Sequence, residues 1–236
     1  MPIRAVLFDK DGTLLDYHLT WGPINVAAAD IAAAGDRVLA DRLLVLGGMD
    51  RTSMITRPGS LLAAAHTTEI AAAWVKAGSP LPLDDLSRRL DALFTASATG
   101  SVPIGDLDAC FSALRAAGLT LGIASSDNEA SIRLMLDHLG LAHHMSFVTG
   151  YDSGHGVKPG PGMALAFAAA LGLRPSEIAV VGDNSHDIDM GRSAGAGLVI
   201  GVLSGTGDAA TLAPIADTCL ADIGELPAFL APYLAG

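Results

Sequence analysis

The sequence predicts a doubly wound α/β fold, a parallel sheet with helices on both faces, that carries an inserted all-helical domain. Three observations support this fold class. From residue 106 onward, short apolar runs alternate with helical segments, which is the pattern of a parallel sheet covered on both faces. One similar run, AVLF at residues 5–8, lies near the start of the chain. Between the two, residues 17–98 are rich in Ala and Leu and show only helical patterns.

The first apolar run is followed by the helical stretch, in which Gly and Pro separate four segments. These segments are residues 21–35, 36–47, 59–78 and 82–97. Pro103 and Gly105 mark the return to the alternating pattern. We therefore predict two domains: residues 1–16 together with 99–236 form an α/β core, and residues 17–98 form a helical cap.

The remaining strands are continuous apolar runs, as expected for strands that are buried on both faces. They are residues 119–124, 146–150, 178–182 and 197–202. The helical segments that precede and separate them are residues 106–118, 128–140, 160–172 and 186–196. A short terminal pair of elements follows. Because strands and helices alternate, the strands are expected to run parallel and to end at the same edge of the sheet.

Composition and charge exclude several classes of protein. Half of the 236 residues are hydrophobic and 17% are charged, so a disordered chain is excluded. The net charge is −11, and a surface this acidic repels nucleic acid and anionic lipid, so neither is an expected partner. No apolar stretch approaches the roughly 20 residues of a membrane span, and the N-terminus lacks the apolar core of a secretory signal. The expected location is therefore cytoplasmic.

Polar and charged side chains follow four of the predicted strands, at the edge where ligands of open α/β sheets bind. These residues are Asp9, Asp11, Ser125, Lys158, Asp183 and Asp187. Any one of them could be an ordinary turn residue or helix N-cap. A matching set at four strand ends is better explained by a shared function.

The set contains the groups that phosphoryl transfer to a carboxylate requires. Asp9 and Asp11 are two residues apart, so in extended backbone their side chains face the same way. One can attack phosphorus while the other donates a proton to the leaving oxygen. Several carboxylates this close would not all stay ionised without a cation, and hard oxygen ligands with room for phosphate indicate Mg²⁺. Lys158 and Ser125 can bind phosphate oxygens.

Four segments in this order, FDKDGTL, IASSDN, GVKPGP and VGDNSHDID, resemble the four motifs of the haloacid dehalogenase (HAD) superfamily. The inserted cap lies where members with a helical cap carry theirs. The resemblance implies a phosphoglycolate phosphatase-like phosphomonoester hydrolase that acts on a small phosphorylated metabolite, as a monomer or homodimer. It implies that Asp9 is the nucleophile and forms an aspartyl-phosphate, that Asp11 is the general acid and base, and that Ser125 and Lys158 bind the phosphoryl group.

The resemblance also implies a Mg²⁺ site. Asp9, the backbone carbonyl of Asp11 and Asp183 would ligate the ion. Asp187 would assist, either through a water molecule or by holding Lys158.

Two residues of the motifs, Lys10 and Ser126, depart from the family pattern. Two residues of the cap, Arg51 and His18, are candidate substrate contacts. Lys10 occupies a position where apolar residues are common; in extended backbone it alternates away from the two neighbouring acids, so no catalytic role is expected. Ser126, which stands where similar phosphatases often have Asn, is a candidate substrate contact. In the cap, Arg51 in the loop at residues 47–60 could bind an anionic part of the substrate, and His18 could contact the leaving group.

Three alternative activities are weighed against this function. Dehalogenases of the superfamily lack the second acid of the first motif, so Asp11 argues against that activity. A β-phosphoglucomutase-like phosphotransferase remains an alternative; such enzymes place a His about a dozen residues after the nucleophile, where this chain has Trp21. A non-catalytic binding or regulatory protein with the same fold is the alternative from another class. Hydrolysis is favoured over the phosphotransferase because Trp21 replaces that His, and over the non-catalytic protein because every acid of the motifs is present.

Overall fold

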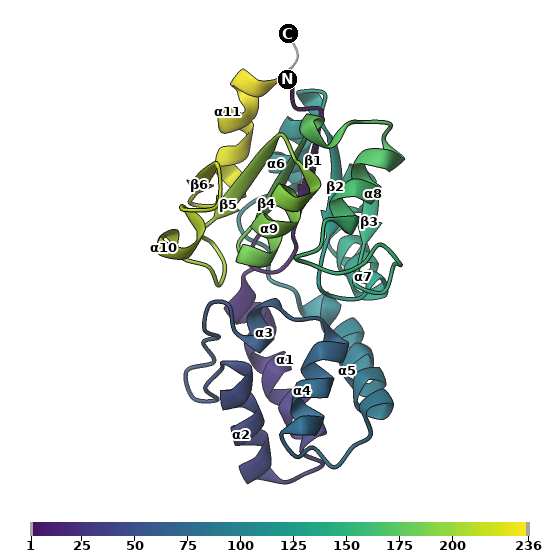
Figure 1. Cartoon of the computed structure of the whole chain (residues 1–236), viewed down its shortest axis with the longest axis vertical. Helices are drawn as coiled ribbons and strands as arrows, with labels where there is room; N and C mark the ends of the chain where they lie inside the picture. Colours follow the sequence, from purple (N-terminus) through teal and green to yellow (C-terminus); the bar gives the residue numbers. More distant parts are fainter. Residues whose placement is uncertain (1, 235–236) are drawn as a thin grey trace.

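The computed structural model describes residues 2–234, and its centre is a six-stranded parallel sheet (Figure 1). The strands are β1 (Ala5–Phe8), β2 (Thr120–Ala124), β3 (Met145–Thr149), β4 (Ile178–Gly182), β5 (Leu198–Val202) and β6 (Thr218–Leu220). Their order across the sheet is β3-β2-β1-β4-β5-β6, with every neighbouring pair parallel. This order confirms the predicted doubly wound α/β class, and its reversal point at β1 creates a crevice at the carboxyl edge.

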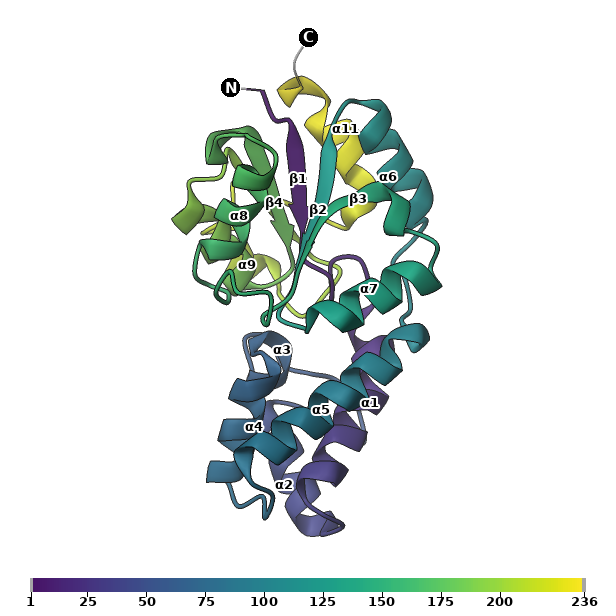
Figure 2. The same ribbon diagram turned by 90° about the vertical axis from the view of Figure 1, so that its right-hand side faces the viewer.

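Helices cover both faces of the sheet (Figure 2). They are α6 (Leu107–Ala116), α7 (Glu129–His138), α8 (Gly162–Ala170), α9 (Ser185–Ala194), α10 (Ala209–Leu212) and α11 (Leu226–Leu230). The alternation of β1 divides the core between the two faces: Val6 and Phe8 pack in the cluster that includes residues of α6, α7 and α11. Ala5 and Leu7 pack in the cluster that includes residues of α8 and α9. Burial on both faces explains why these strands are continuous apolar runs.

The helical stretch forms a second body below the carboxyl edge of the sheet in Figure 1. Its helices are α1 (Tyr17–Ala32), α2 (Arg37–Gly47), α3 (Leu61–Ala64), α4 (Thr67–Lys76) and α5 (Leu83–Ser97). They surround their own apolar cluster, in which Leu43, Trp74, Leu86 and Leu90 are fully buried. This body is called the cap from here on. The exact division at residues 16/17 and 98/99 stays a prediction.

Two details of the cap differ from the expected helices. The first helix begins four residues earlier than the predicted residue 21, because the Asp16 side chain accepts a hydrogen bond from the Leu19 amide and caps the helix at Tyr17. The segment predicted as one helix over residues 59–78 is two helices, α3 and α4. Ala65 and His66 are extended between them, and the His66 ring stacks on Tyr151 of the core.

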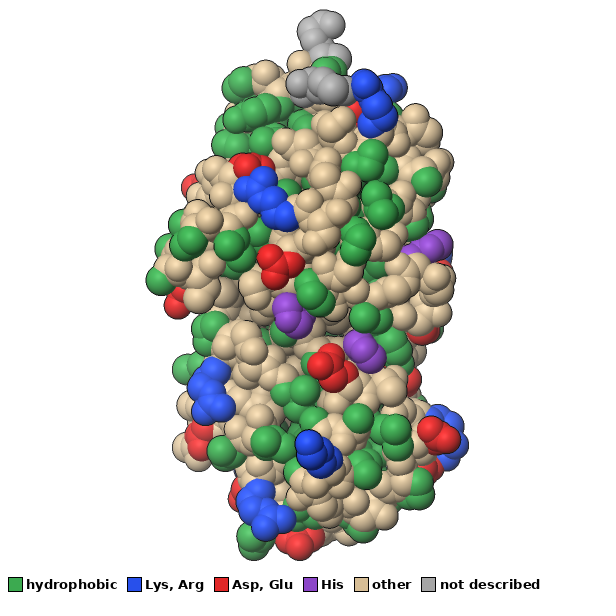
Figure 3. Space-filling model, viewed as in Figure 1, with side chains coloured by type: hydrophobic (Ala, Val, Ile, Leu, Met, Phe, Trp, Pro, Cys, Tyr) green, Lys and Arg blue, Asp and Glu red, His purple; other side chains and the backbone are tan. Residues whose placement is uncertain are grey.

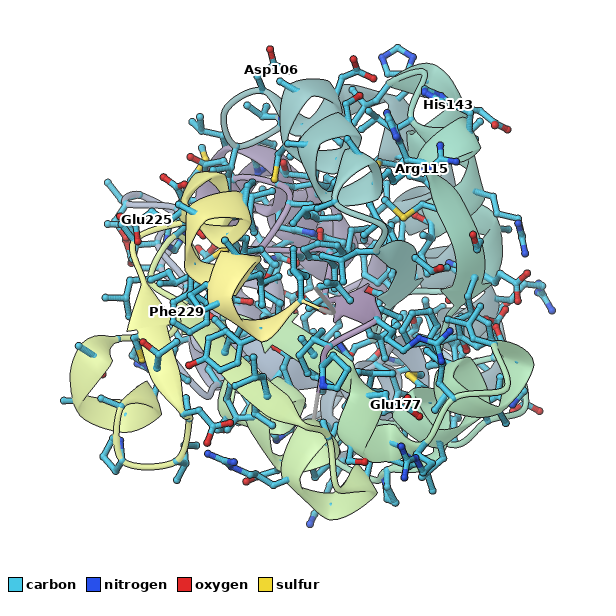
Figure 4. All side chains as sticks on the ribbon, turned by 90° about the horizontal axis from the view of Figure 1, so that it is seen from above. Asp106, Arg115, His143, Glu177, Glu225 and Phe229 are labelled. Carbon is cyan, nitrogen blue, oxygen red and sulfur yellow. The ribbon has the colours of Figure 1, made fainter. Side chains whose placement is uncertain are left out.

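The opposite end of the molecule faces away from the cap. Figure 4 looks onto this end, where Glu177 directly precedes β4 and Arg115 lies near His143. The amino ends of the strands are therefore on the far side, and their carboxyl ends face the cap. No helix among residues 2–234 is long and apolar enough to cross a membrane.

Candidate active site

A pocket lies between the carboxyl edge of the sheet and the cap, with a volume of about 60 Å³. The core contributes all of the predicted strand-end residues to its lining. These are Asp9, Asp11, Ser125, Lys158, Asp183 and Asp187. The cap contributes side chains from α1, α3, α4 and α5. Residues from four strand ends and from the cap thus meet in one place.

Asp9 lies directly after β1, and Lys158 reaches it from the loop after β3. The Asp9 amide donates to the Val181 carbonyl at 2.8 Å, which fixes the carboxylate beside β4. The Lys158 ammonium donates to Asp9 Oδ1 at 2.5 Å and to Asp187 Oδ1 at 2.6 Å, and all three side chains are buried. The pKa of Asp9 is raised to about 6, mainly by burial and then by the Asp187 charge, while Lys158 opposes the rise.

Asp9, Asp183 and Asp187 form the one buried carboxylate cluster within residues 2–234 whose oxygens could share a metal ion. One oxygen from each lies within 4.8 Å of the others. Asp183 Oδ2 accepts from the Thr206 amide at 2.7 Å and from the Thr206 hydroxyl at 3.1 Å. Burial, followed by the charges of Asp9 and Asp187, raises the pKa of Asp183 well above its usual value. Three crowded carboxylates against one ammonium fit a hard divalent cation, since oxygen is the ligand that such ions prefer.

Two glycines let the backbone close around Asp183. Gly12 has a φ of +87°, and a Cβ on it would lie 2.4 Å from Asp183 Oδ2. A Cβ on Gly205 would lie 2.1 Å from the same oxygen. The Ser204 hydroxyl also donates to the Gly12 carbonyl at 2.8 Å. The loop after β5 therefore supports the site.

Asp11 is held by one residue of the core and one of the cap. The Trp21 indole N–H, from α1, donates to Asp11 Oδ1 at 2.5 Å. The Lys10 ammonium lies 3.1 Å from Asp11 Oδ2. The pKa of Asp11 is raised to about 6, mainly by burial; the Lys10 charge opposes this rise, and the charges of Asp127 and Asp9 add to it. Asp11 thus stands apart from the Lys158 cluster, with its own partners.

The expectation that Lys10 points away from the neighbouring acids was wrong. Its ammonium points to Asp11 and donates to Asp127 Oδ2 at 2.7 Å, and the residue is only 2% exposed. The strand ends at Phe8 and the chain turns at Gly12, so the alternation of extended backbone does not continue through Lys10. A single spacer residue in a motif gives no sign of such a partner, because Asp127 is 117 positions away.

The predicted substrate residues separate into two groups. Ser125 and Ser126 line the pocket; Ser125 Oγ accepts from the Asp127 amide at 3.1 Å, and Ser126 Oγ donates to the Ala64 carbonyl of the cap at 3.3 Å. Arg51 and His18 are not among the residues that line it.

Arg51 and His18 have partners within the cap. The Arg51 guanidinium donates to Asp30 and Asp41, each at 2.6 Å. His18 Nδ1 accepts from the Thr56 amide at 3.5 Å. The cap side of the pocket is instead built by residues that the sequence did not single out as substrate contacts. They are Tyr17, Trp21, Asn25, Leu62, Ala63, Ala64, Ala65, Thr67, Ile70 and Phe94.

Comparison with known proteins agrees with the geometry. Residues 3–195 match the sequence model of haloacid dehalogenase-like hydrolases. The chain is 30% identical over 212 residues to a phosphoglycolate phosphatase from Salmonella typhimurium, covering 82% of this chain and 79% of the relative. A phosphoglycolate phosphatase from Xylella fastidiosa is 31% identical over 195 residues, covering 81% and 77%.

Solved structures show the same fold. A HAD family hydrolase from Deinococcus radiodurans with bound phosphate and sodium has a TM-score of 0.67 and 26% identity, covering 98% of this chain and 96% of that one. CbbY from Rhodobacter sphaeroides in complex with phosphate has a TM-score of 0.70 and 18% identity, covering 95% and 96%.

Proposed function

Because the chain belongs to the haloacid dehalogenase-like hydrolase family, we propose that it is a Mg²⁺-dependent phosphatase that hydrolyses small phosphomonoesters through an aspartyl-phosphate. The observation that carries this proposal is the separation of two carboxylates in one pocket. Asp9 is paired with Lys158, whereas Asp11 has separate partners in Lys10 and Trp21. A nucleophile and a proton donor need such different surroundings.

In the first step, an Asp9 oxygen forms a bond to phosphorus while the bond to the ester oxygen breaks. Lys158 offsets the negative charge of Asp9 and of a phosphate oxygen, and the Ser125 hydroxyl can donate to another oxygen. Asp11 gives its proton to the departing alcohol. In the second step, Asp11 takes a proton from water, whose oxygen attacks phosphorus and releases Asp9 and phosphate.

The residues that would hold Mg²⁺ are Asp9, Asp183 and the backbone carbonyl of Asp11, and Asp187 would assist by fixing Lys158. When bound, the ion supplies positive charge to the phosphoryl oxygens and lowers the repulsion between phosphate and the carboxylates. Thr206 holds Asp183 in place for this role, because it donates two hydrogen bonds to one carboxylate oxygen.

Trp21 supports hydrolysis over the phosphotransferase alternative. An indole N–H can donate a hydrogen bond but cannot accept a proton, so Trp21 can orient Asp11 without taking part in proton transfer. A non-catalytic protein would not need the buried contacts of Lys158 with Asp9 and Asp187. It would not need the contacts of Asp11 with Lys10 and Trp21 either. We also expect a cytoplasmic protein whose substrate is a small metabolite rather than nucleic acid or lipid. It could act as a monomer or a homodimer.

The test is phosphate release from p-nitrophenyl phosphate with Mg²⁺, for the natural protein and for Asp9→Asn. The amide keeps the shape of the side chain but is not a nucleophile, so turnover should fall by about 10³-fold or more. Chelation of the metal should have a comparable effect, restored by added Mg²⁺. If Asp9→Asn retains more than a few per cent of the activity, the proposed nucleophile is wrong. If neither protein releases phosphate, the binding or regulatory alternative is favoured.

A further inference from the structure

We propose that the leaving-group side of this pocket is built for an uncharged, oxygen-bearing alcohol, so that phosphate esters of neutral alcohols are preferred over esters that carry a second anionic group. The inference rests on the proposed hydrolase function and narrows its substrate class. Its first support is the charge of the pocket lining. Among the described lining residues, Lys158 is the only Lys or Arg, and its ammonium is already shared between Asp9 and Asp187.

The cap side of the pocket has no described residue with a formal charge. Its walls are the rings of Trp21 and Phe94, whose centroids are 5.0 Å apart, and the small or branched side chains of α3 and α4, such as Leu62 and Ile70. A carboxylate placed against these walls would lose its hydration without gaining a cationic partner, which is strongly unfavourable.

The two arginines of the cap loop at residues 47–60 are engaged elsewhere. Arg51 is bound to Asp30 of α1 and Asp41 of α2, so all three belong to the cap and a cap that closes as a body would carry them together. Arg57 lies against the Val45 carbonyl at 3.4 Å. On the face drawn in Figure 3, the blue side chains of the cap are spread over its outer surface.

The core side of the pocket adds a negative field. Five carboxylates line it, whereas Lys158 and the Lys10 ammonium behind Asp11 and Asp127 are the cations in contact with them. With Asp11 protonated and one divalent cation added, the formal charge of this group is zero, and the negative charge of the bound phosphate then makes it negative. A second anionic group on the substrate would therefore be repelled by the core as well as desolvated by the cap.

Two unpartnered polar atoms indicate what the pocket accepts instead. The Asn25 side chain lines the pocket and is 1% exposed, yet its Nδ2 has no hydrogen-bond partner among residues 2–234. The Tyr17 hydroxyl beside it donates to the Leu62 carbonyl and is close enough to Asn25 to interact with it, although the two are not in hydrogen-bond geometry. His186 Nδ1 is likewise buried without a partner in the described chain. A buried amide donor and an imidazole nitrogen suit a neutral hydroxyl or carbonyl oxygen on the leaving group.

The test uses two esters of the same shape, phosphoglycolate and its amide, carbamoylmethyl phosphate. For the natural protein, kcat/KM should be at least tenfold higher for the amide. The dissociation constants of both esters are measured with the Asp9→Asn variant, which separates binding from turnover, and should favour the amide in the same way. Equal values, or a preference for phosphoglycolate, would overturn the inference. Hydrolysis of p-nitrophenyl phosphate is the reference: if it is absent too, the proposed hydrolase function has failed instead.

Variants of the cap side sharpen the test. Ala65→Lys places a cation at a half-buried lining position and should raise kcat/KM for phosphoglycolate about tenfold over Ala65→Met, which has similar length without charge. Asn25→Ala should lower kcat/KM for the amide by about tenfold and leave p-nitrophenyl phosphate less affected. If the natural protein prefers phosphoglycolate and His186→Gln removes that preference, the inference is overturned and His186 is the partner of the carboxylate.

Discussion

The two sides of the pocket are built from different kinds of contact. On the core side, charged groups are buried and held by several short bonds, as with Asp183 and the two donors of Thr206. On the cap side, the lining is uncharged, and its shape comes from rings and small side chains such as Trp21, Phe94 and Ala64. From this difference we infer that the core supplies the chemistry and the cap selects the substrate, and the two sides meet at the Trp21–Asp11 hydrogen bond.

The largest effect is expected on the core side, from Lys10→Met. Removing Lys10 leaves Asp11 and Asp127 buried without a nearby ammonium, so unfolding free energy should fall by about 3 kcal/mol. Denaturant titration measures this loss. In the background of Lys10→Met, the further change Asp127→Asn should recover part of it, because one of the two uncompensated charges is then gone. An unchanged midpoint for Lys10→Met would show that these contacts do not stabilise the fold.

The second largest effect is expected in the stability of the metal-free protein, which should depend on pH. The pKa values of Asp9 and Asp11 are raised to about 6 from an ordinary value near 3.8, and that of Asp183 is raised as well. A carboxyl with a raised pKa favours the fold below its unfolded pKa, and this contribution is lost as pH rises through the folded value. The free energy of unfolding of the chelated protein should therefore fall by about 2 kcal/mol between pH 5 and 7.5.

Thermal unfolding with chelator and with Mg²⁺, at pH 5, 6 and 7.5, measures this dependence. Bound Mg²⁺ should weaken the pH dependence of the unfolding temperature, because a divalent cation offsets the charges that form as the carboxyls ionise. The pKa values of Lys10 and Lys158 are raised above the usual lysine value, so these groups keep their protons throughout the window. A chelated protein that gains stability from pH 5 to 7.5 would contradict the burial of ionisable carboxyls at this site.

The third prediction concerns the contact that joins the two sides. Trp21→Phe keeps a ring against Phe94 but removes the donor to Asp11. Turnover of an alkyl phosphate, a poor leaving group that needs a well-placed acid, should fall about tenfold, whereas p-nitrophenyl phosphate should be less affected. KM should change little for either. Trp74→Phe is the matched control, because its indole donates to the Leu43 carbonyl inside the cap. Trp74→Phe should leave unchanged the ratio of the turnover of the alkyl phosphate to that of p-nitrophenyl phosphate.

The core side was largely predictable from the sequence, and the cap side was not. Asp9 and Ser125 follow strands directly, Lys158 lies in the loop after β3, and a parallel sheet brings strand ends together whatever the details of packing. The contact of Trp21 with Asp11 depends on how the cap docks onto the core, which no local pattern encodes. The partner of Lys10 was missed for the same reason, since it lies in a loop far along the chain.

The smallest effect is expected for Arg51→Ala, which tests the one cap cation that the sequence favoured as a substrate contact. Its partners Asp30 and Asp41 are about half exposed, and exposed ion pairs contribute little, so the free energy of unfolding should fall by less than about 1 kcal/mol. Because Arg51 does not line the pocket, kcat/KM should stay within about twofold for both an anionic and a neutral ester. A selective rise in KM for the anionic ester would place Arg51 at the substrate after all. The uncharged cap side would then be a feature of the open pocket alone, because the guanidinium would have to leave Asp30 and Asp41 when substrate binds.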